Sequence, residues 1–174
     1  LGEESKREPL LINHFLKYEF DQKYGRKYYL CLGDCGIGKT TFLINLYYET
    51  LRQKKKLNCV FISLQDSGCL ATIEKTSNPE KTVLLLDALD ENENAVTNFD
   101  KFMTDLENAT KKFYRVIVTS RTNFFVTEEK ERLSNKKSSI STSSKFVDAR
   151  KYYIAPFTDE DIQRYLKHRY HSKK

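Results

Sequence analysis

The chain lacks the residue patterns that are typical of structural zinc sites and of membrane-spanning proteins. It has four cysteines and three histidines among 174 residues. No pair of cysteines has CxxC spacing and no histidine pair stands near them, which argues against a zinc site and indicates reduced thiols in a cytoplasm. There is no apolar run of about 18 residues and no signal-peptide pattern, so we expect neither a membrane span nor export. The expected location is the cytoplasm.

The charge balance is not that of a highly basic or highly acidic protein. Hydrophobic residues make up 39% and aromatic residues 13%, which is typical of a globular domain, and the formal net charge is only +6. Basic runs at 54–56, 111–112 and 136–137 stand where helices or loops are expected to end, without an aromatic platform beside them. We interpret them as solvated surface and do not expect direct binding of nucleic acid.

The most specific motif lies at residues 33–40, GDCGIGKT, which matches the phosphate-loop pattern GxxxxGK[ST]. An apolar run precedes it and a helix-like stretch follows, so backbone N–H groups and the positive end of the helix would converge on phosphate oxygens. Lys39 would reach the β- and γ-phosphates, and the Thr40 hydroxyl would hold Mg²⁺. The residues expected to contact the nucleotide are Gly33, Asp34, Cys35, Gly36, Ile37, Gly38, Lys39, Thr40 and Thr41.

A second constellation follows the most apolar run of the chain, at 83–86. A buried strand ending in Asp87 can carry a carboxylate to the Mg²⁺ shell beside Thr40. Asp90 and Glu91 follow at the same end of that strand, where one of them could polarise an attacking water. The alternative is that the acidic turn at 90–93 only caps the next helix.

A third element is the apolar strand that ends in Thr119, Ser120 and Arg121. The Arg121 guanidinium could contact the γ-phosphate and so distinguish ATP from ADP, because its fork of donors suits phosphate oxygens. Alternatively, Arg121 is an ordinary surface arginine.

Strands and helices alternate along the chain, and the strands are continuously apolar, which predicts a parallel sheet covered on both faces. The expected strands are 27–32, 58–63, 82–86, 115–119 and 151–154. The expected helices are 9–20, 41–54, 68–76, 96–110 and 159–169, with an irregular loop at 134–145.

The expected division is a helical lead-in at 1–26, a phosphate-loop core at 27–155 and a final helix at 156–174. Thr158 and Asp161 have capping-box spacing at the start of this helix. Ile162, Tyr165 and Leu166 share one of its faces, so we expect a docked helix.

The set GDCGIGKTT, LLLDALDE, VIVTSR and IAPFTDEDIQRYL resembles the NACHT nucleotide-binding domain of STAND-class signalling ATPases. The resemblance implies a three-layer α/β/α sandwich with a five-stranded, mainly parallel sheet in the order 5-1-4-3-2. It also implies Mg²⁺ with ATP or ADP, slow hydrolysis in a switch that controls self-association, and the adenine near Pro9 and Leu10. In particular, the chain resembles bacterial NACHT proteins that act in antiphage defence, with trigger and effector in other parts of the protein.

Two departures from the family pattern and four alternatives remain. The stretch 65–81 is short, and the chain stops where the family continues into a lid and a winged-helix domain, so we expect a fragment. A small-molecule kinase would share the phosphate loop, but Asp90 and Glu91 favour water as acceptor. A GTPase would need an aspartate where Ser138 stands. A binding module with negligible turnover, or another ATPase of AAA+ type, stays open.

Overall fold

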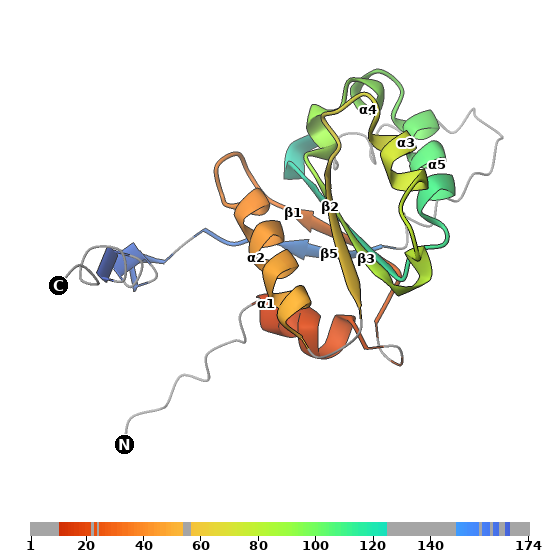
Figure 1. The fold of residues 1–174 in the computed structure, drawn as a ribbon. Helices are drawn as coiled ribbons and strands as arrows, with labels where there is room; N and C mark the ends of the chain where they lie inside the picture. The colour runs from red at the N-terminus through yellow and green to blue at the C-terminus, as the bar shows by residue number, and fades with distance from the viewer. Residues whose placement is uncertain are drawn as a thin grey trace.

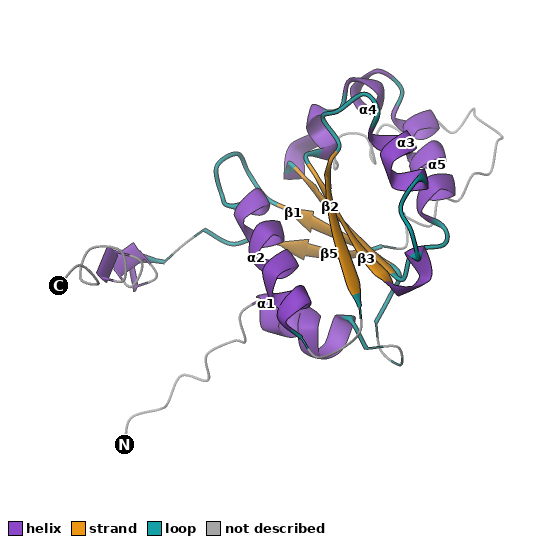
Figure 2. Cartoon of the chain, in the orientation of Figure 1, coloured by secondary structure: helices purple, strands orange, loops and turns teal. Residues whose placement is uncertain are grey.

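Five parallel strands form one central sheet with helices on both of its faces (Figure 1, Figure 2). The computed structural model describes residues 11–21, 23, 25–53, 57–124, 149–156, 158–160, 162–163 and 166–167. The strands are β1 (Tyr28–Leu32), β2 (Asn58–Ser63), β3 (Thr82–Asp87), β4 (Arg115–Ser120) and β5 (Arg150–Tyr153). Their order across the sheet is β2-β3-β4-β1-β5. This is the predicted order 5-1-4-3-2 counted from the other edge, so the predicted fold is confirmed.

The middle of the sheet is made by β3, β4 and β1, whose residues are all buried. Strand β4 pairs with both others: Val116 is in register with Leu84 of β3 and with Tyr28 of β1. Side chains that are apolar on both faces suit this position, since each face is covered by helices. Because all strands run parallel, the segments that follow β1, β3 and β4 meet at the carboxyl-terminal side of the sheet.

Each face of the sheet carries its own core. On one face, α1 (Leu11–His14), the π-helical turn η1 (Phe15–Glu19) and α2 (Lys39–Arg52) cover a cluster that includes Tyr29, Leu85 and Ile117. On the other, α3 (Cys69–Glu74), α4 (Glu93–Thr97) and α5 (Phe99–Thr110) cover a cluster that includes Leu84 and Val118. Two short 3-10 turns, η2 (Pro79–Lys81) and η3 (Leu89–Glu91), lie at the two ends of β3. The result is the predicted three-layer arrangement.

The single helix predicted at 96–110 is instead two helices, α4 and α5, which meet at Asn98. Asn98 has φ −148° and ψ 81°, which is not helical, and its side-chain oxygen accepts the N–H of Lys101 at 3.1 Å. Asparagine is among the best helix N-caps because its side chain takes an N–H that the first turn leaves unpaired. The helix therefore restarts at Asn98, and α4 begins in the same way at Asn92.

A buried carboxylate, Glu19, joins η1 to the edge of the sheet. Its Oε2 accepts the hydroxyl of Tyr29 at 2.8 Å, and its Oε1 accepts from Tyr152 and Arg150 of β5. His14 Nε2 lies 3.1 Å from the same Oε1. We call these five side chains the Glu19 cluster. Sequence reasoning missed it because a single acid in an amphipathic segment is ordinarily a solvated residue.

The end of the chain only partly matches its prediction. The final strand runs over Arg150–Tyr153, one residue earlier than expected, and the N–H of Ile162 donates to the carbonyl of Thr158 at 3.0 Å. However, Ile162 and Leu166 are 44% and 45% exposed, so these two side chains do not dock as we expected. The predictions at 1–10, with Pro9 and Leu10, at 134–145, and at Asp161 and Tyr165 lie outside the described residues. Within the described part of the chain, no helix combines the length and apolar character needed to cross a bilayer.

Candidate functional site

The loop after β1 turns back on two glycines before α2 begins at Lys39. Gly36 has φ 75° and Gly38 has φ 101°, conformations that side chains with a Cβ rarely adopt. Gly38 is also the residue that caps α2, so the start of this helix faces the loop. At the base of the loop, a Cβ on Gly33 would come within 2.7 Å of the Ile37 side chain. These glycines allow the close turn that a phosphate-binding loop requires.

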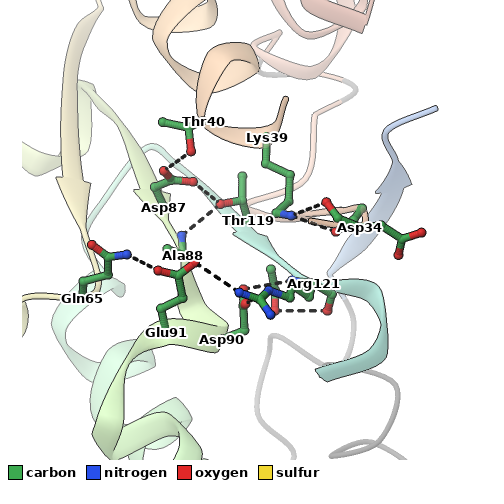
Figure 3. Close-up of polar contacts among 12 residues, drawn as sticks. Asp34, Lys39, Thr40, Gln65, Asp87, Ala88, Asp90, Glu91, Thr119 and Arg121 are labelled. Atoms are coloured by element: carbon green, nitrogen blue, oxygen red, sulfur yellow. Dashed lines mark hydrogen bonds and ion pairs between the residues drawn. The ribbon is translucent and has the colours of Figure 1, made fainter. Parts of the chain in front are cut away.

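Lys39 lies along this loop (Figure 3). Its Nζ donates to the carbonyl oxygens of Gly33 and Asp34, each at 2.8 Å. Both contacts are made with loop backbone, which holds the ammonium group against the loop. A positive charge there is suited to phosphate oxygens.

Asp87 connects the loop to the central strands. Its carboxylate is buried, with the residue 7% exposed, and Oδ2 accepts the hydroxyl of Thr40 at 2.7 Å. Oδ1 accepts the hydroxyl of Thr119 at 2.5 Å. The two residues predicted to hold Mg²⁺ are thus in direct contact, although one comes from α2 and the other from β3.

A sharp turn at Ala88 brings the acidic residues of η3 to the same side of the sheet. Ala88 has φ 62°, and its N–H donates to the Thr119 hydroxyl at 3.1 Å. Asp90 then contacts Arg121 twice, at 2.9 Å from Nε to Oδ2 and at 2.9 Å from the backbone N–H to Oδ1. The Nη2 of Arg121 lies 3.6 Å from Oε1 of Glu91.

The acidic turn at 90–93 does cap the following helix, but through Asn92 and not through the carboxylates of Asp90 and Glu91. The side chain of Asn92 caps α4 by accepting the N–H of Ala95 at 2.9 Å. Glu91 instead accepts a hydrogen bond from the amide of Gln65, which follows β2 (Figure 3). The three predicted catalytic residues, Asp90, Glu91 and Arg121, therefore form one group beside the phosphate loop.

These groups surround a cavity of about 290 Å³ that is open to solvent. Its volume is near the lower end for ligand cavities, about 300–1,000 Å³. The lining residues are Cys35, Gly36, Gly38, Lys39, Thr40, Thr41, Asp87, Ala88, Asp90, Glu91 and Arg121. Gly33, Asp34 and Ile37 complete the same loop without lining the cavity. The structure thus brings all the predicted site residues to one place.

The donor set fits Mg²⁺ carried by a nucleotide. A hydroxyl and a carboxylate are hard oxygen ligands, and Mg²⁺ in such sites usually takes one or two protein ligands, with phosphate oxygens and waters as the rest. Thr40 and Asp87 supply such a pair. Among the described residues no group of three or more histidine, cysteine, aspartate or glutamate side chains could hold a metal by itself.

Sequence reasoning missed two residues of the site. Thr119 was noted only as a polar strand end, and its contacts with Asp87 and Ala88 depend on β4 lying next to β3. Gln65 gives no local signal, since it follows a strand as an ordinary polar residue. Cys35 is an exposed free thiol in the loop, whereas the other three cysteines are free and buried. Burial raises the pKa of Cys59 to about 12, which keeps that thiol protonated.

The fold and the phosphate loop define the chain as a P-loop NTPase. A family model described as novel STAND NTPase 3 matches residues 22–161. The chain belongs to this family, which confirms the STAND class that the sequence motifs indicated.

Several solved structures share this fold at low sequence identity. AMPPCP-bound DnaA from Aquifex aeolicus has a TM-score of 0.56 and 14% identity, over 91% of this chain and 50% of that one. Domain III of DnaA from Thermotoga maritima has a TM-score of 0.53 and 15% identity, over 92% and 66%. The RuvB branch migration motor of Thermotoga maritima has a TM-score of 0.51 and 17% identity, over 90% and 47%.

These likenesses concern the fold alone. This chain spans about half the length of the first two solved structures it matches. Among curated proteins, no sequence match was found.

Proposed function

We propose that this chain binds ATP and ADP with Mg²⁺ and hydrolyses ATP slowly, as the core of a signalling switch. The observation that carries the proposal is the 2.7 Å contact between Thr40 and Asp87, in a cavity that Lys39 also lines. A hydroxyl, a buried carboxylate and a lysine side chain around one cavity suit Mg²⁺ and phosphate together.

Different residues would bind the phosphates and activate the water. Loop N–H groups, the start of α2 and Lys39 hold the phosphates. Thr40 and Asp87 would hold Mg²⁺ as its protein ligands, and the ion would supply positive charge that offsets the charge of the phosphates. The side chain of Glu91 is 42% exposed at the cavity, where it can accept a proton from a water, and the buried Asp90 holds Arg121.

Arg121 makes the site sensitive to the γ-phosphate. Its guanidinium contacts Asp90 and Glu91, and its side chain is 50% exposed, so it can exchange these partners for a phosphate oxygen. A γ-phosphate that draws Arg121 away also frees Glu91 from a positive charge. ATP and ADP would then stabilise different arrangements of η3, which is what a switch needs, since a ligand shifts an equilibrium only by its differential affinity.

The resemblance to bacterial NACHT proteins extends the proposal to self-association and antiphage defence. In such a protein the nucleotide state would control self-association, and the trigger and the effector would be other than residues 1–174. We also propose a cytoplasmic location, which the four free cysteines favour.

A second candidate is a nucleotide-binding module with negligible turnover. The contacts of Glu91 with Arg121 and Gln65 favour it, because a carboxylate that already accepts from two side chains has fewer lone pairs left for a water. The two candidates differ in hydrolysis and agree on binding.

The test is to denature the purified protein, identify released nucleotide by chromatography, and then follow phosphate release by the protein after nucleotide removal and addition of Mg-ATP. Co-purified ADP and slow turnover support the switch. Binding without phosphate release supports the second candidate, and a preference for GTP over ATP contradicts both.

A further inference from the structure

Thr119 is buried beside the end of β3, which carries Asp87, and the turn at Ala88, which leads into η3. It belongs to β4 and is 0% exposed. Its hydroxyl donates to Oδ1 of Asp87 at 2.5 Å and accepts the N–H of Ala88 at 3.1 Å. It is not among the residues that line the cavity. Whatever Thr119 contributes to ligand binding therefore passes through its neighbours.

The first contact fixes the direction of the Asp87 carboxylate. The backbone carbonyl of Asp87 is held from the β2 side by the N–H of Leu64 at 2.9 Å. The side chain is held from the β4 side, because Thr119 takes Oδ1 and leaves Oδ2 directed at Thr40 (Figure 3). A carboxylate with one oxygen held by a hydroxyl loses its freedom to rotate about the terminal torsion, which is otherwise broad. Such contacts orient metal ligands in proteins.

The second contact stabilises the turn that follows. Ladder pairing between β3 and β4 ends at Leu86 and Val118, so the N–H of Ala88 has no strand partner there. Ala88 also has φ 62° and ψ 52°, a left-handed conformation that is unfavourable for a residue with a Cβ. The Thr119 hydroxyl supplies the acceptor that this N–H needs. The turn is what brings η3, with Asp90 and Glu91, to the cavity.

We infer that Thr119 is a positioning residue, which aims Asp87 at the metal and holds the Ala88 turn. This inference rests on the proposed function, since it assigns Thr119 to the same Mg²⁺-nucleotide site. One hydroxyl can do both tasks because it has one hydrogen to donate and two lone pairs to accept with. A valine, which has the same branched shape, can do neither.

The test compares Thr119→Val with Thr119→Ser in the full chain, using ATP with a fluorescent label on the ribose. Nucleotide binding is titrated with Mg²⁺ and, separately, in EDTA. We expect the valine variant to need about tenfold more Mg²⁺ for half-maximal binding and to bind metal-free nucleotide as the unchanged protein does. The serine variant keeps the hydroxyl and is expected to restore the Mg²⁺ dependence.

Thr110→Val is the matched control. Thr110 is also 0% exposed, and its hydroxyl donates to the Leu106 carbonyl at 2.7 Å within α5. Its loss removes a buried hydroxyl without touching the cavity, so stability is expected to fall while the Mg²⁺ dependence is unchanged. If Thr119→Val does not fold, Thr119→Ala removes the same hydroxyl without adding bulk, and the same titration applies.

Asp87→Asn separates the inference from the proposed function. An unchanged Mg²⁺ dependence in Asp87→Asn contradicts the proposed metal site itself. If Asp87→Asn loses much of its Mg²⁺-dependent nucleotide binding and the Thr119 variants lose none, only the positioning role is contradicted. In the double variant, the Thr119→Val effect on Mg²⁺ is expected to disappear, because no carboxylate remains to be aimed.

Discussion

Replacing Glu19 with glutamine is expected to destabilise the fold without touching the nucleotide site. The Glu19 carboxylate accepts from Tyr29, Tyr152 and Arg150, and its side chain is only 1% exposed. A glutamine has one acceptor oxygen and presents an amide N–H₂ to donors, so one side of the cluster loses its acceptor. A hydrogen bond to a charged group contributes about 1.5–3 kcal/mol.

The Arg150 side chain is 39% exposed and recovers hydration from solvent, which limits the loss. We expect the free energy of unfolding to fall by about 2–3 kcal/mol at pH 7. For a chain of this length each kcal/mol shifts Tm by about 2–4 °C, so the expected shift is about 4–12 °C. Thermal unfolding followed by circular dichroism measures it. Glu74→Gln, at an exposed position on α3, is the matched control and is expected to stay within about 0.5 kcal/mol.

The stability difference between Glu19→Gln and the unchanged protein is expected to depend on pH. Burial alone would raise the pKa of Glu19, but hydrogen bonds from Tyr152, Tyr29 and Arg150 outweigh it, and the pKa lies below its ordinary value of 4.5. The carboxylate therefore stabilises the fold fully above that ordinary value, and the contribution is lost as the pH falls through the lowered pKa. The difference between the two proteins should shrink as the pH falls below about pH 4. A difference under about 0.5 kcal/mol at pH 7 would refute this reasoning.

Three further predictions concern the site and the helix break. Glu91→Gln should keep Mg-ATP affinity and lower phosphate release about 100-fold or more, as removal of a general base does; normal turnover would exclude Glu91 as the base. Arg121→Ala should reduce the preference for ATP over ADP by up to about tenfold in a competition titration, because one charge-assisted contact with the γ-phosphate is lost; an unchanged ratio would make Arg121 a surface residue. Asn98→Ala should lower the free energy of unfolding by about 1 kcal/mol in urea, since the cap on Lys101 disappears; no change would mean that tertiary packing alone sets the break.

The parts of this structure that a local pattern encodes could be predicted. The phosphate loop is contiguous, and each of its glycines and its lysine has a fixed place in the motif, so residues 33–40 could be assigned from spacing alone. The sheet order came from the family resemblance, because no local feature states which strand lies beside which. Asp87 followed from its place at the end of an apolar strand.

The features that prediction missed depend on distant contacts. Thr119 matters because β4 lies next to β3, and Glu19 matters because β5 brings Arg150 and Tyr152 to it across more than a hundred residues. The break at Asn98 was local but hidden, since apolar periodicity continues through it. The role of asparagine as a cap outweighed that periodicity.

The most direct test of the central claim is a titration of the nucleotide-free protein and of Lys39→Ala with ATP, ADP and GTP in the presence of Mg²⁺. Among the described residues, the Lys39 ammonium group donates only to the backbone of its own loop, so its loss should leave the fold intact, as thermal unfolding can verify. We predict that the unchanged protein binds ATP and ADP in preference to GTP and that Lys39→Ala binds none of them measurably. Unchanged affinity of Lys39→Ala for Mg-ATP would contradict the account.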